Sequence, residues 1–188
     1  MTTICAVRKS NRVAISCDTC ASCGASVDRA GYVVNHSKIL SIGEYHIALT
    51  GPTSAKLAVS TYFEENGAVS LKSVETIFKV WLELHHYLKE TCFLREPNDK
   101  DNSYESSDFD ALIASPHGIF GVTSHRAVQE YTKFYAFGRG DEYAMGAMFA
   151  SYDAEDMSAD AIARLGVAAA AEFTGTTVLP AVVKIIEV

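Results

Sequence analysis

The chain has 188 residues, of which 48% are hydrophobic and 21% are charged, so it can bury an extensive core and is not a disordered tail. Its length predicts one domain, residues 1–188. The net charge of −7 argues against binding to nucleic acid or to an anionic membrane surface. No apolar run reaches the ~20 residues of a membrane span, and the first residues do not form a secretory signal. We therefore expect a cytoplasmic protein without nucleic-acid or membrane partners.

Five cysteines, an odd number without an export signal, argue against disulfides. Cys17, Cys20 and Cys23 form a C-x2-C-x2-C run that is similar to part of an iron–sulfur ligand set. A fourth ligand at close spacing is missing, and no proline follows the last cysteine. We therefore expect reduced cysteines packed as small apolar side chains and no bound metal, with cluster binding as the alternative interpretation.

The first half of the chain is predicted to form strands and then two helices. Strands are expected at residues 3–8, 13–17, 39–42 and 46–50, the first two as a hairpin. The first helix should begin after residues 51–54, with Thr53 or Ser54 as its cap, and end at residues 66–67. The second has apolar residues at helical spacing, namely Val74, Ile77, Phe78, Trp81, Leu84, His85 and Leu88. On that face His85 is expected to be a packed side chain rather than a metal ligand.

The second half is predicted to repeat this order. Strands are expected at residues 111–115, 119–123 and 131–137, and a last β-branched strand at 178–188. Helices are expected at residues 141–152 and from Ser158 onward, the latter with Ile162, Leu165, Ala169 and Phe173 on one side. Runs of strands that alternate with pairs of helices favour packed sheets covered by helices on the outside.

Residues 95–110 interrupt this compact pattern. The segment holds six acidic residues, two basic ones and almost no apolar ones, so we expect a solvated loop. A loop of this length inside a compact domain is either functional or disordered. Its negative charge would attract basic or weakly charged molecules and repel acidic ones.

A few polar residues near predicted strand ends can carry chemistry. Removal of Met1, which a small second residue permits, gives Thr2 both a hydroxyl nucleophile and an α-amine whose pKa lies near neutrality. Asp18 ends an apolar strand and needs a cation, which Lys38 can supply. Gly51, before a helix, offers an amide for an oxyanion. Each feature also has an ordinary interpretation. Many proteins begin with Met-Thr, Asp18 and Lys38 can form a purely structural ion pair, and Gly51 can belong to an ordinary turn.

The order and spacing of these residues resemble a proteasome-type β-subunit, a threonine peptidase of the N-terminal-nucleophile hydrolase superfamily, and most of all its bacterial HslV branch. The resemblance covers essentially the whole chain and is carried by residues 2–4, Asp18 with 21–24, Lys38, Gly51, 137–140 with 143–144, and 157–160. It implies an α+β fold, a four-layer αββα sandwich, and copies that stack into double rings whose active sites face an inner chamber.

The resemblance also implies roles for individual residues. Thr2 matches the nucleophile with its α-amine as the base, Asp18 matches the carboxylate that holds Lys38, and Gly51 matches the oxyanion donor. Together they imply an endopeptidase that uses no metal or organic cofactor.

Substrate contacts and partners are implied in the same way. Ser22 falls where the family binds the substrate backbone, and Leu49 falls near the pocket for the side chain before the scissile bond. The implied partners are further copies in stacked rings and unfolded polypeptides or peptides, with an AAA+ unfoldase left open. Six-membered rings are typical of HslV, and seven-membered rings of the subgroup favoured below.

The sequence departs from the family at several positions. Arg139 stands where a serine usually supports the terminal amine, and its guanidinium can either replace that hydrogen bond or lower the pKa of the amine by repulsion. Pro52 replaces a second glycine and removes an N–H. Glu172 is only a loose match to a further acidic position. The stretch 18–38 is longer than usual, and 95–110 is an insertion, as in the small betaproteobacterial proteasome homologue group.

Two alternatives to an active peptidase remain. A catalytically silent ring subunit or scaffold is compatible with the departures, although retention of Thr2, Asp18 and Lys38 argues against it, because an unmatched buried lysine is costly. A different amide hydrolase of the superfamily would use Cys5 or Cys17 as nucleophile, and neither can be N-terminal.

Overall fold

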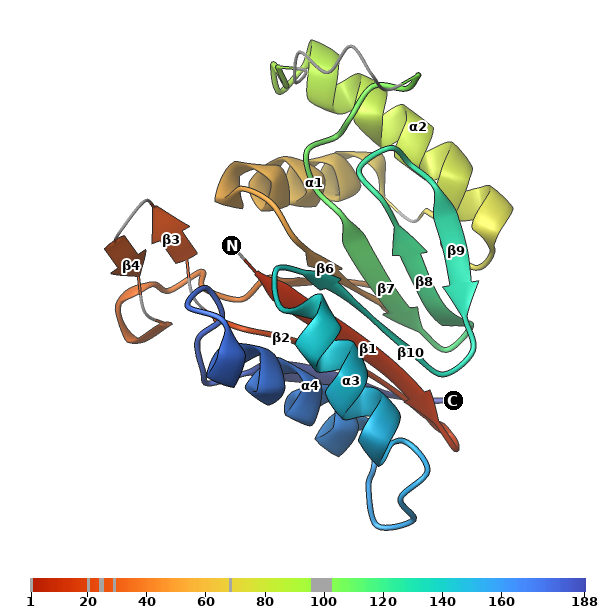
Figure 1. The fold of residues 1–188 in the computed structure, drawn as a ribbon. Coiled ribbons are helices and arrows are strands. Elements are labelled where there is room, and N and C mark those ends of the chain that lie inside the picture. The colour runs from red at the N-terminus through yellow and green to blue at the C-terminus, as the bar shows by residue number, and fades with distance from the viewer. Residues whose placement is uncertain (1, 20, 24–25, 29, 68, 96–102) are drawn as a thin grey trace.

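Two antiparallel sheets form the centre of the protein (Figure 1). The computed structural model describes residues 2–19, 21–23, 26–28, 30–67, 69–95 and 103–188, with only the backbone course at 21–23 and 26–28. The first sheet has the order β10-β1-β2-β11, from β1 (Thr3–Lys9), β2 (Arg12–Cys17), β10 (Phe134–Gly138) and β11 (Val182–Glu187). The second has the order β5-β6-β7-β8-β9, from β5 (Ile39–Ile42), β6 (Tyr45–Leu49), β7 (Ala111–Ser115), β8 (Gly118–Val122) and β9 (Val128–Tyr131).

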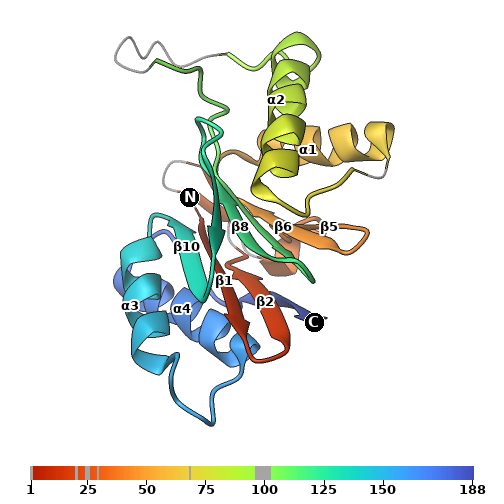
Figure 2. The same ribbon diagram turned by 90° about the vertical axis from the view of Figure 1, so that its right-hand side faces the viewer.

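Helices cover the outer face of each sheet. Helices α1 (Thr53–Asn66) and α2 (Val74–Glu90) lie on the second sheet, and α3 (Asp141–Ser151) and α4 (Ala159–Phe173) lie on the first (Figures 1 and 2). Along β1, Ile4 and Ala6 face the other sheet, whereas Cys5 and Val7 face α3 and α4. This alternation buries both faces of the strand, because successive side chains point to opposite sides. The expected αββα sandwich is confirmed.

The helices begin largely where the sequence indicated. Ser73 caps α2 in a capping box with Thr76, and Ser158 caps α4 by accepting a hydrogen bond from the amide of Ala161. The expected cap of α1 is wrong. Its N-cap is Pro52, which makes no side-chain capping bond, and Thr53 already belongs to the first turn.

The predicted apolar face of α4 is right for Ile162 but wrong for Leu165 and Phe173. Its buried residues are mostly small, namely Ala159, Ile162, Ala163, Gly166, Val167 and Ala170, whereas Leu165 and Phe173 are exposed. A side chain at Gly166 would come within 3.1 Å of Cys5 Sγ and of Met148 Cγ. The helix therefore buries small residues because it approaches its neighbours closely. On α2, Phe78 is likewise exposed, although the rest of its stripe is buried or half-buried as expected.

One predicted strand needs correction, and three short elements were not predicted. Residues 131–137 are not one strand, because β9 ends at Tyr131 in one sheet and β10 begins at Phe134 in the other. No glycine or proline marks that break. The sequence also gave no signal for the short ribbon of β3 (Ala21–Cys23) and β4 (Ser26–Asp28) or for the 3-10 turn η1 (Ala30–Tyr32), since each has only three residues.

The acidic segment is not purely a solvated loop. Within its described part, Ser107 and Phe109 are buried, and the amide of Ser107 donates to the carbonyl of Ser124 at 2.8 Å. Phe109 joins the core between the second sheet and its helices. One aromatic residue therefore anchors a segment whose composition indicated solvation, while residues 96–102 lie outside the described part. No described helix has the length and hydropathy of a membrane span.

Candidate active site

Thr2 directly precedes β1 in the first sheet. It is only 5% exposed, and its carbonyl oxygen accepts a hydrogen bond from the amide of Arg139 at 3.2 Å. Gly138 has a φ of 107°, and a Cβ there would overlap the carbonyl oxygen of Thr2. Glycine at 138 thus allows the β1–β10 pairing to reach Thr2. The expected removal of Met1 falls outside the described residues.

Asp18 and Lys38 meet beside Thr2. Lys38 Nζ lies 2.8 Å from each carboxylate oxygen of Asp18, and the amide of Thr3 donates to Asp18 Oδ1 at 3.0 Å. Asp18 is fully buried, whereas 15% of the Lys38 side chain is exposed. One buried carboxylate is therefore held by an ammonium and by the residue next to Thr2. Such charge-assisted bonds offset much of the cost of burying the charge.

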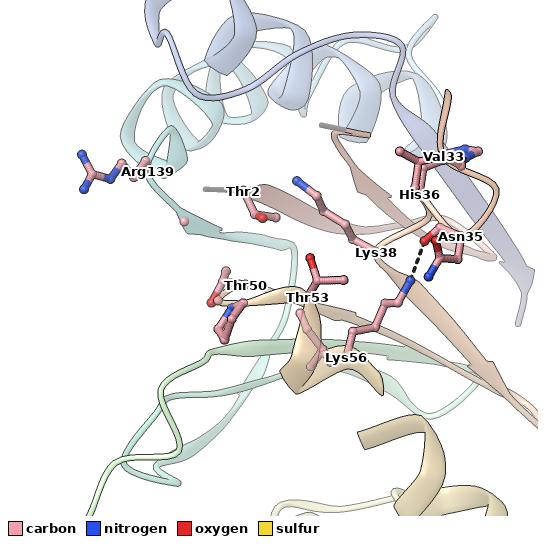
Figure 3. Close-up of a pocket in the computed structure, with 13 residues that line it drawn as sticks. Thr2, Val33, Asn35, His36, Lys38, Thr50, Thr53, Lys56 and Arg139 are labelled. Atoms are coloured by element: carbon pink, nitrogen blue, oxygen red, sulfur yellow. Dashed lines mark hydrogen bonds between the residues drawn. The ribbon is translucent and has the colours of Figure 1, made fainter. Parts of the chain in front are cut away.

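These residues open into a cavity of about 420 Å³ (Figure 3). Thr2 and Lys38, which precede β1 and β5, line it together with Leu49 at the end of β6 and Gly51 shortly after it. Its other lining residues are Val33, Asn35, His36, Thr50, Pro52, Thr53, Lys56, Gly138 and Arg139. The structure thus brings three predicted catalytic positions and one predicted substrate position to a single cavity, and Asp18 is held behind it by Lys38.

Gly51 forms the turn between β6 and α1. Its φ is +82°, and a Cβ there would lie 2.7 Å from the carbonyl oxygen of Asp108 and 2.9 Å from Phe109 Cβ. Both the backbone conformation and the close approach require glycine. Among the described residues, no acceptor pairs with the amide of Gly51. This amide, at the start of α1, is therefore suited to hold a negatively charged oxygen in the cavity.

Comparison with solved structures gives close and distant matches. BPH from Thiobacillus denitrificans is 46% identical over 98% of this chain and 97% of its own, with a TM-score of 0.94. The same protein in complex with epoxomicin is 46% identical over 98% of both chains, with a TM-score of 0.93. The chain belongs to the betaproteobacterial proteasome homologue family. Eukaryotic HslV from Trypanosoma brucei, 18% identical over 98% of this chain and 99% of its own, shares the fold with a TM-score of 0.74.

No family model matches the chain, and no curated protein matches it. Membership of the family therefore rests on the near-complete alignment to BPH, at an identity well above that of the HslV match.

The family departures take a clear form in the structure. Arg139 is exposed, and its guanidinium is directed away from Thr2, so it makes neither of the contacts expected from the sequence (Figure 3). Arg139 bonds to Thr2 through its backbone amide, which donates to the carbonyl of Thr2. Glu172 is exposed on α4. Instead, Thr177 Oγ1 lies 2.7 Å from Thr3 Oγ1, a contact that no sequence motif indicated.

Of the two expected substrate-binding residues, the structure describes the side chain of Leu49 but not that of Ser22. Leu49 is buried at the end of β6 and lines the cavity. Ser22 lies in β3, and its side chain falls outside the described part. Sequence reasoning missed the cavity wall from Val33 to His36 and Lys56, because these residues form no motif and come together only in the fold.

Cys5 and Cys17, the two cysteines considered as nucleophiles, are buried thiols. Burial raises the pKa of Cys17 to about 12 and raises that of Cys5 further, so both remain thiols at neutral pH. Cys20 and the side chain of Cys23 lie outside the described residues. Within the described residues, no group of three or more His, Cys, Asp or Glu side chains is arranged to hold a metal ion.

Proposed function

We propose that this chain is a threonine endopeptidase in which Thr2, exposed by removal of Met1, attacks a peptide carbonyl. The observation that carries the proposal is the ion pair between the buried Asp18 and Lys38, whose side chain lines the same cavity as Thr2. A fold can end a strand without a buried carboxylate and its lysine partner, and such a pair costs desolvation energy. Placed beside a hydroxyl, the ammonium stabilises the alkoxide character that develops during attack.

The proposed reaction uses groups of this chain alone. The α-amine of Thr2 takes the proton of its own hydroxyl, and Oγ1 bonds to the carbonyl carbon. The Gly51 amide donates to the resulting oxyanion. Collapse breaks the peptide C–N bond, and the proton passes from the α-amine to the leaving amine. Water, deprotonated by the α-amine, then attacks the ester, so that the carboxylic acid product leaves and Oγ1 regains its proton.

Asp18 acts as a positioning residue in this proposal. Its Oδ1 accepts hydrogen bonds from both Lys38 Nζ and the amide of Thr3, so a single atom fixes the ammonium relative to the strand that carries Thr2. Because effective attack needs the reacting groups within a few tenths of an ångström of their optimum, this link favours catalysis.

Copies of the chain are proposed to assemble into stacked rings that act on peptides or unfolded polypeptides, as expected for a proteasome homologue. Exposed aromatic side chains on α3 and α4, among them Tyr143, Phe149 and Phe173, support contact between copies. An AAA+ unfoldase is a further candidate partner.

Mass spectrometry of the intact chain tests the proposal. A peptide epoxyketone reacts with both the hydroxyl and the free amine of an N-terminal threonine, and epoxomicin is bound by the BPH of Thiobacillus denitrificans. We expect the wild type to lack Met1 and to gain the mass of one inhibitor. Thr2→Ala should neither gain mass nor cleave peptides, while its particle size by gel filtration should not change.

A matched control is Thr132→Ala, which removes an exposed threonine between β9 and β10 and should retain labelling. A wild-type chain that keeps Met1, or that stays unmodified, would instead identify a silent ring subunit.

A further inference from the structure

A second lysine distinguishes the cavity of this chain. Three cationic side chains line it, from Lys38, Lys56 and Arg139, and none of its described lining residues is acidic. The charge of Lys38 is balanced by the buried carboxylate of Asp18, and Arg139 is directed away from Thr2 in Figure 3. Lys56 therefore supplies the positive charge that no carboxylate of the cavity wall balances.

Two backbone carbonyls hold Lys56 in place. Its Nζ donates to the carbonyl oxygens of Asn35 at 2.7 Å and of Ser37 at 2.8 Å. These acceptors are neutral, so they orient the ammonium without cancelling its charge, and an ammonium has a third donor. Partial burial lowers the pKa of Lys56, which means that the charged form is incompletely solvated. An anionic group that entered the cavity would supply the missing partner.

The position of Lys56 relative to Thr2 indicates what kind of anion this is. Lys56 lies in the early turns of α1, and Figure 3 shows Thr53, from the start of the same helix, between Lys56 and Thr2. Asn35 lies beside the Lys56 ammonium, and the buried Leu49 also lines the space. A substrate residue bonded at Thr2 would pass its side chain along this wall, with methylene groups against apolar atoms and its tip near the ammonium.

We infer that the cavity selects an acidic side chain, glutamate or aspartate, at the residue whose carbonyl Thr2 attacks, and that Lys56 is the specificity-determining residue. This inference rests on the proposed peptidase function. A carboxylate at the tip accepts a charge-assisted hydrogen bond from Lys56, whereas a lysine or arginine side chain meets a like charge. A purely aliphatic side chain leaves the ammonium without an ionic partner. The preference is thus opposite to the one expected from the acidic segment 95–110 alone.

Four fluorogenic peptides test the inference, identical except for Glu, Gln, Leu or Lys before the scissile bond. We expect kcat/KM for the Glu peptide to exceed that for the Gln peptide about tenfold, the size expected for one hydrogen bond to a charged group, and to decrease as salt rises. Lys56→Gln should bring the Glu-to-Gln ratio to about one, because the amide can still donate to the carbonyls of Asn35 and Ser37 but carries no charge. Lys56→Arg should keep most of the preference.

Lys79→Gln, on the exposed face of α2, removes the same charge from the chain and should keep the wild-type ratio. A wild type that cleaves the Leu or Gln peptide as fast as the Glu peptide overturns the inference and leaves the peptidase intact. An unchanged ratio in Lys56→Gln also overturns it. Absence of cleavage of all four peptides, together with absence of epoxyketone labelling, overturns the proposed function and this inference with it.

Discussion

Two ionic clusters of the chain differ in how far water reaches them. Asp18 is fully buried under Lys38, whereas the cluster of His85, Glu105 and Lys89 at the outer surface leaves 45% of the Glu105 side chain exposed. Distances hardly separate them, since Lys89 Nζ lies 2.7 Å from Glu105 Oε1 and Lys38 Nζ lies 2.8 Å from Asp18 Oδ2. Solvent screens the charges of Lys89 and Glu105 much more than the charge of Asp18. The two ion pairs therefore differ in interaction energy although their distances are nearly equal.

The two clusters are also connected through the backbone. His85 Nδ1 lies 2.9 Å from Ser107 Oγ, so the outer cluster holds the segment that continues to residue 110. Asp108 and Phe109 pack against Gly51, and the carbonyl of Asp110 accepts a hydrogen bond from the amide of Thr50 at 2.9 Å. The outer cluster thus braces the turn that carries the proposed oxyanion donor.

Lys38→Met should have the largest effect. It leaves the carboxylate of Asp18 buried without its cation, so we expect a loss of about 3–5 kcal/mol in the free energy of unfolding, and loss of peptide cleavage. Urea denaturation at pH 7 measures the first, and cleavage of a fluorogenic peptide measures the second. The double variant Asp18→Asn with Lys38→Met should recover part of the stability but no activity, because it removes both charges. A loss below about 1 kcal/mol in the single variant would show that water reaches Asp18 after all.

Gly51→Ala should follow in size. The added methyl group meets the backbone at Asp108 and requires a left-handed conformation, so we expect a loss of roughly 2–3 kcal/mol and much slower cleavage. Gly43→Ala is the matched control, since Gly43 has a φ of +57° with open space around it. The difference between the two isolates the cost of the contact from the cost of the conformation. Equal unfolding free energies for Gly51→Ala and Gly43→Ala would mean that residues 108–109 move aside at no cost. That result would contradict the connection between the outer cluster and the turn at Gly51.

The pH dependence of the unfolding free energy should report the contribution of His85 in the outer cluster. Burial lowers the pKa of His85 below its value in the unfolded chain, about 6.5. The unfolded state therefore binds more protons as the pH falls through that value, so the contribution of His85 to stability is present above pH ~6.5 and is lost below it. We expect a smaller effect than for Lys38 or Gly51, measured as the slope of the unfolding free energy between pH 7.5 and 5.5, values chosen to bracket the imidazole pKa of about 6.5.

His85→Gln should flatten that slope. His86→Gln, on the exposed face of the same helix, should leave it unchanged. His46, whose pKa burial also lowers, contributes equally in both variants and so cancels in the comparison. Identical slopes in the two variants would show that His85 is not held neutral by the fold.

Local patterns predicted much of this architecture. The periodicity of α2 is encoded within a few residues, as is the hairpin of β1 and β2. Spacing and resemblance placed Asp18 opposite Lys38. Features that depend on distant segments escaped, because no local signal encodes them: Phe109 is buried only when the second sheet and its helices come together.

The same limit applies to the cavity. Lys56 appears in the sequence as one exposed position of a helix with no marked apolar face. Its significance arises from the loop at 33–37, where the carbonyls of Asn35 and Ser37 hold its ammonium in the cavity wall. Specificity is therefore the part of the site that the sequence conveys least, whereas the Asp18–Lys38 pair follows from a costly charge at a strand end.

The smallest effect is expected for the exposed pair of Lys89 and Glu105. A double-mutant cycle with Lys89→Ala and Glu105→Gln should give a coupling of about 0.5 kcal/mol in low salt that falls toward zero at about 1 M salt, where the Debye length is only ~3 Å. A parallel cycle on Asp18 and Lys38 should give a coupling several times larger that salt barely changes, because no solvent reaches Asp18. Urea denaturation of the variants at the two salt concentrations measures both couplings. Equal couplings with equal salt dependence would contradict the view that burial, and not distance, sets the strength of the pair beside Thr2.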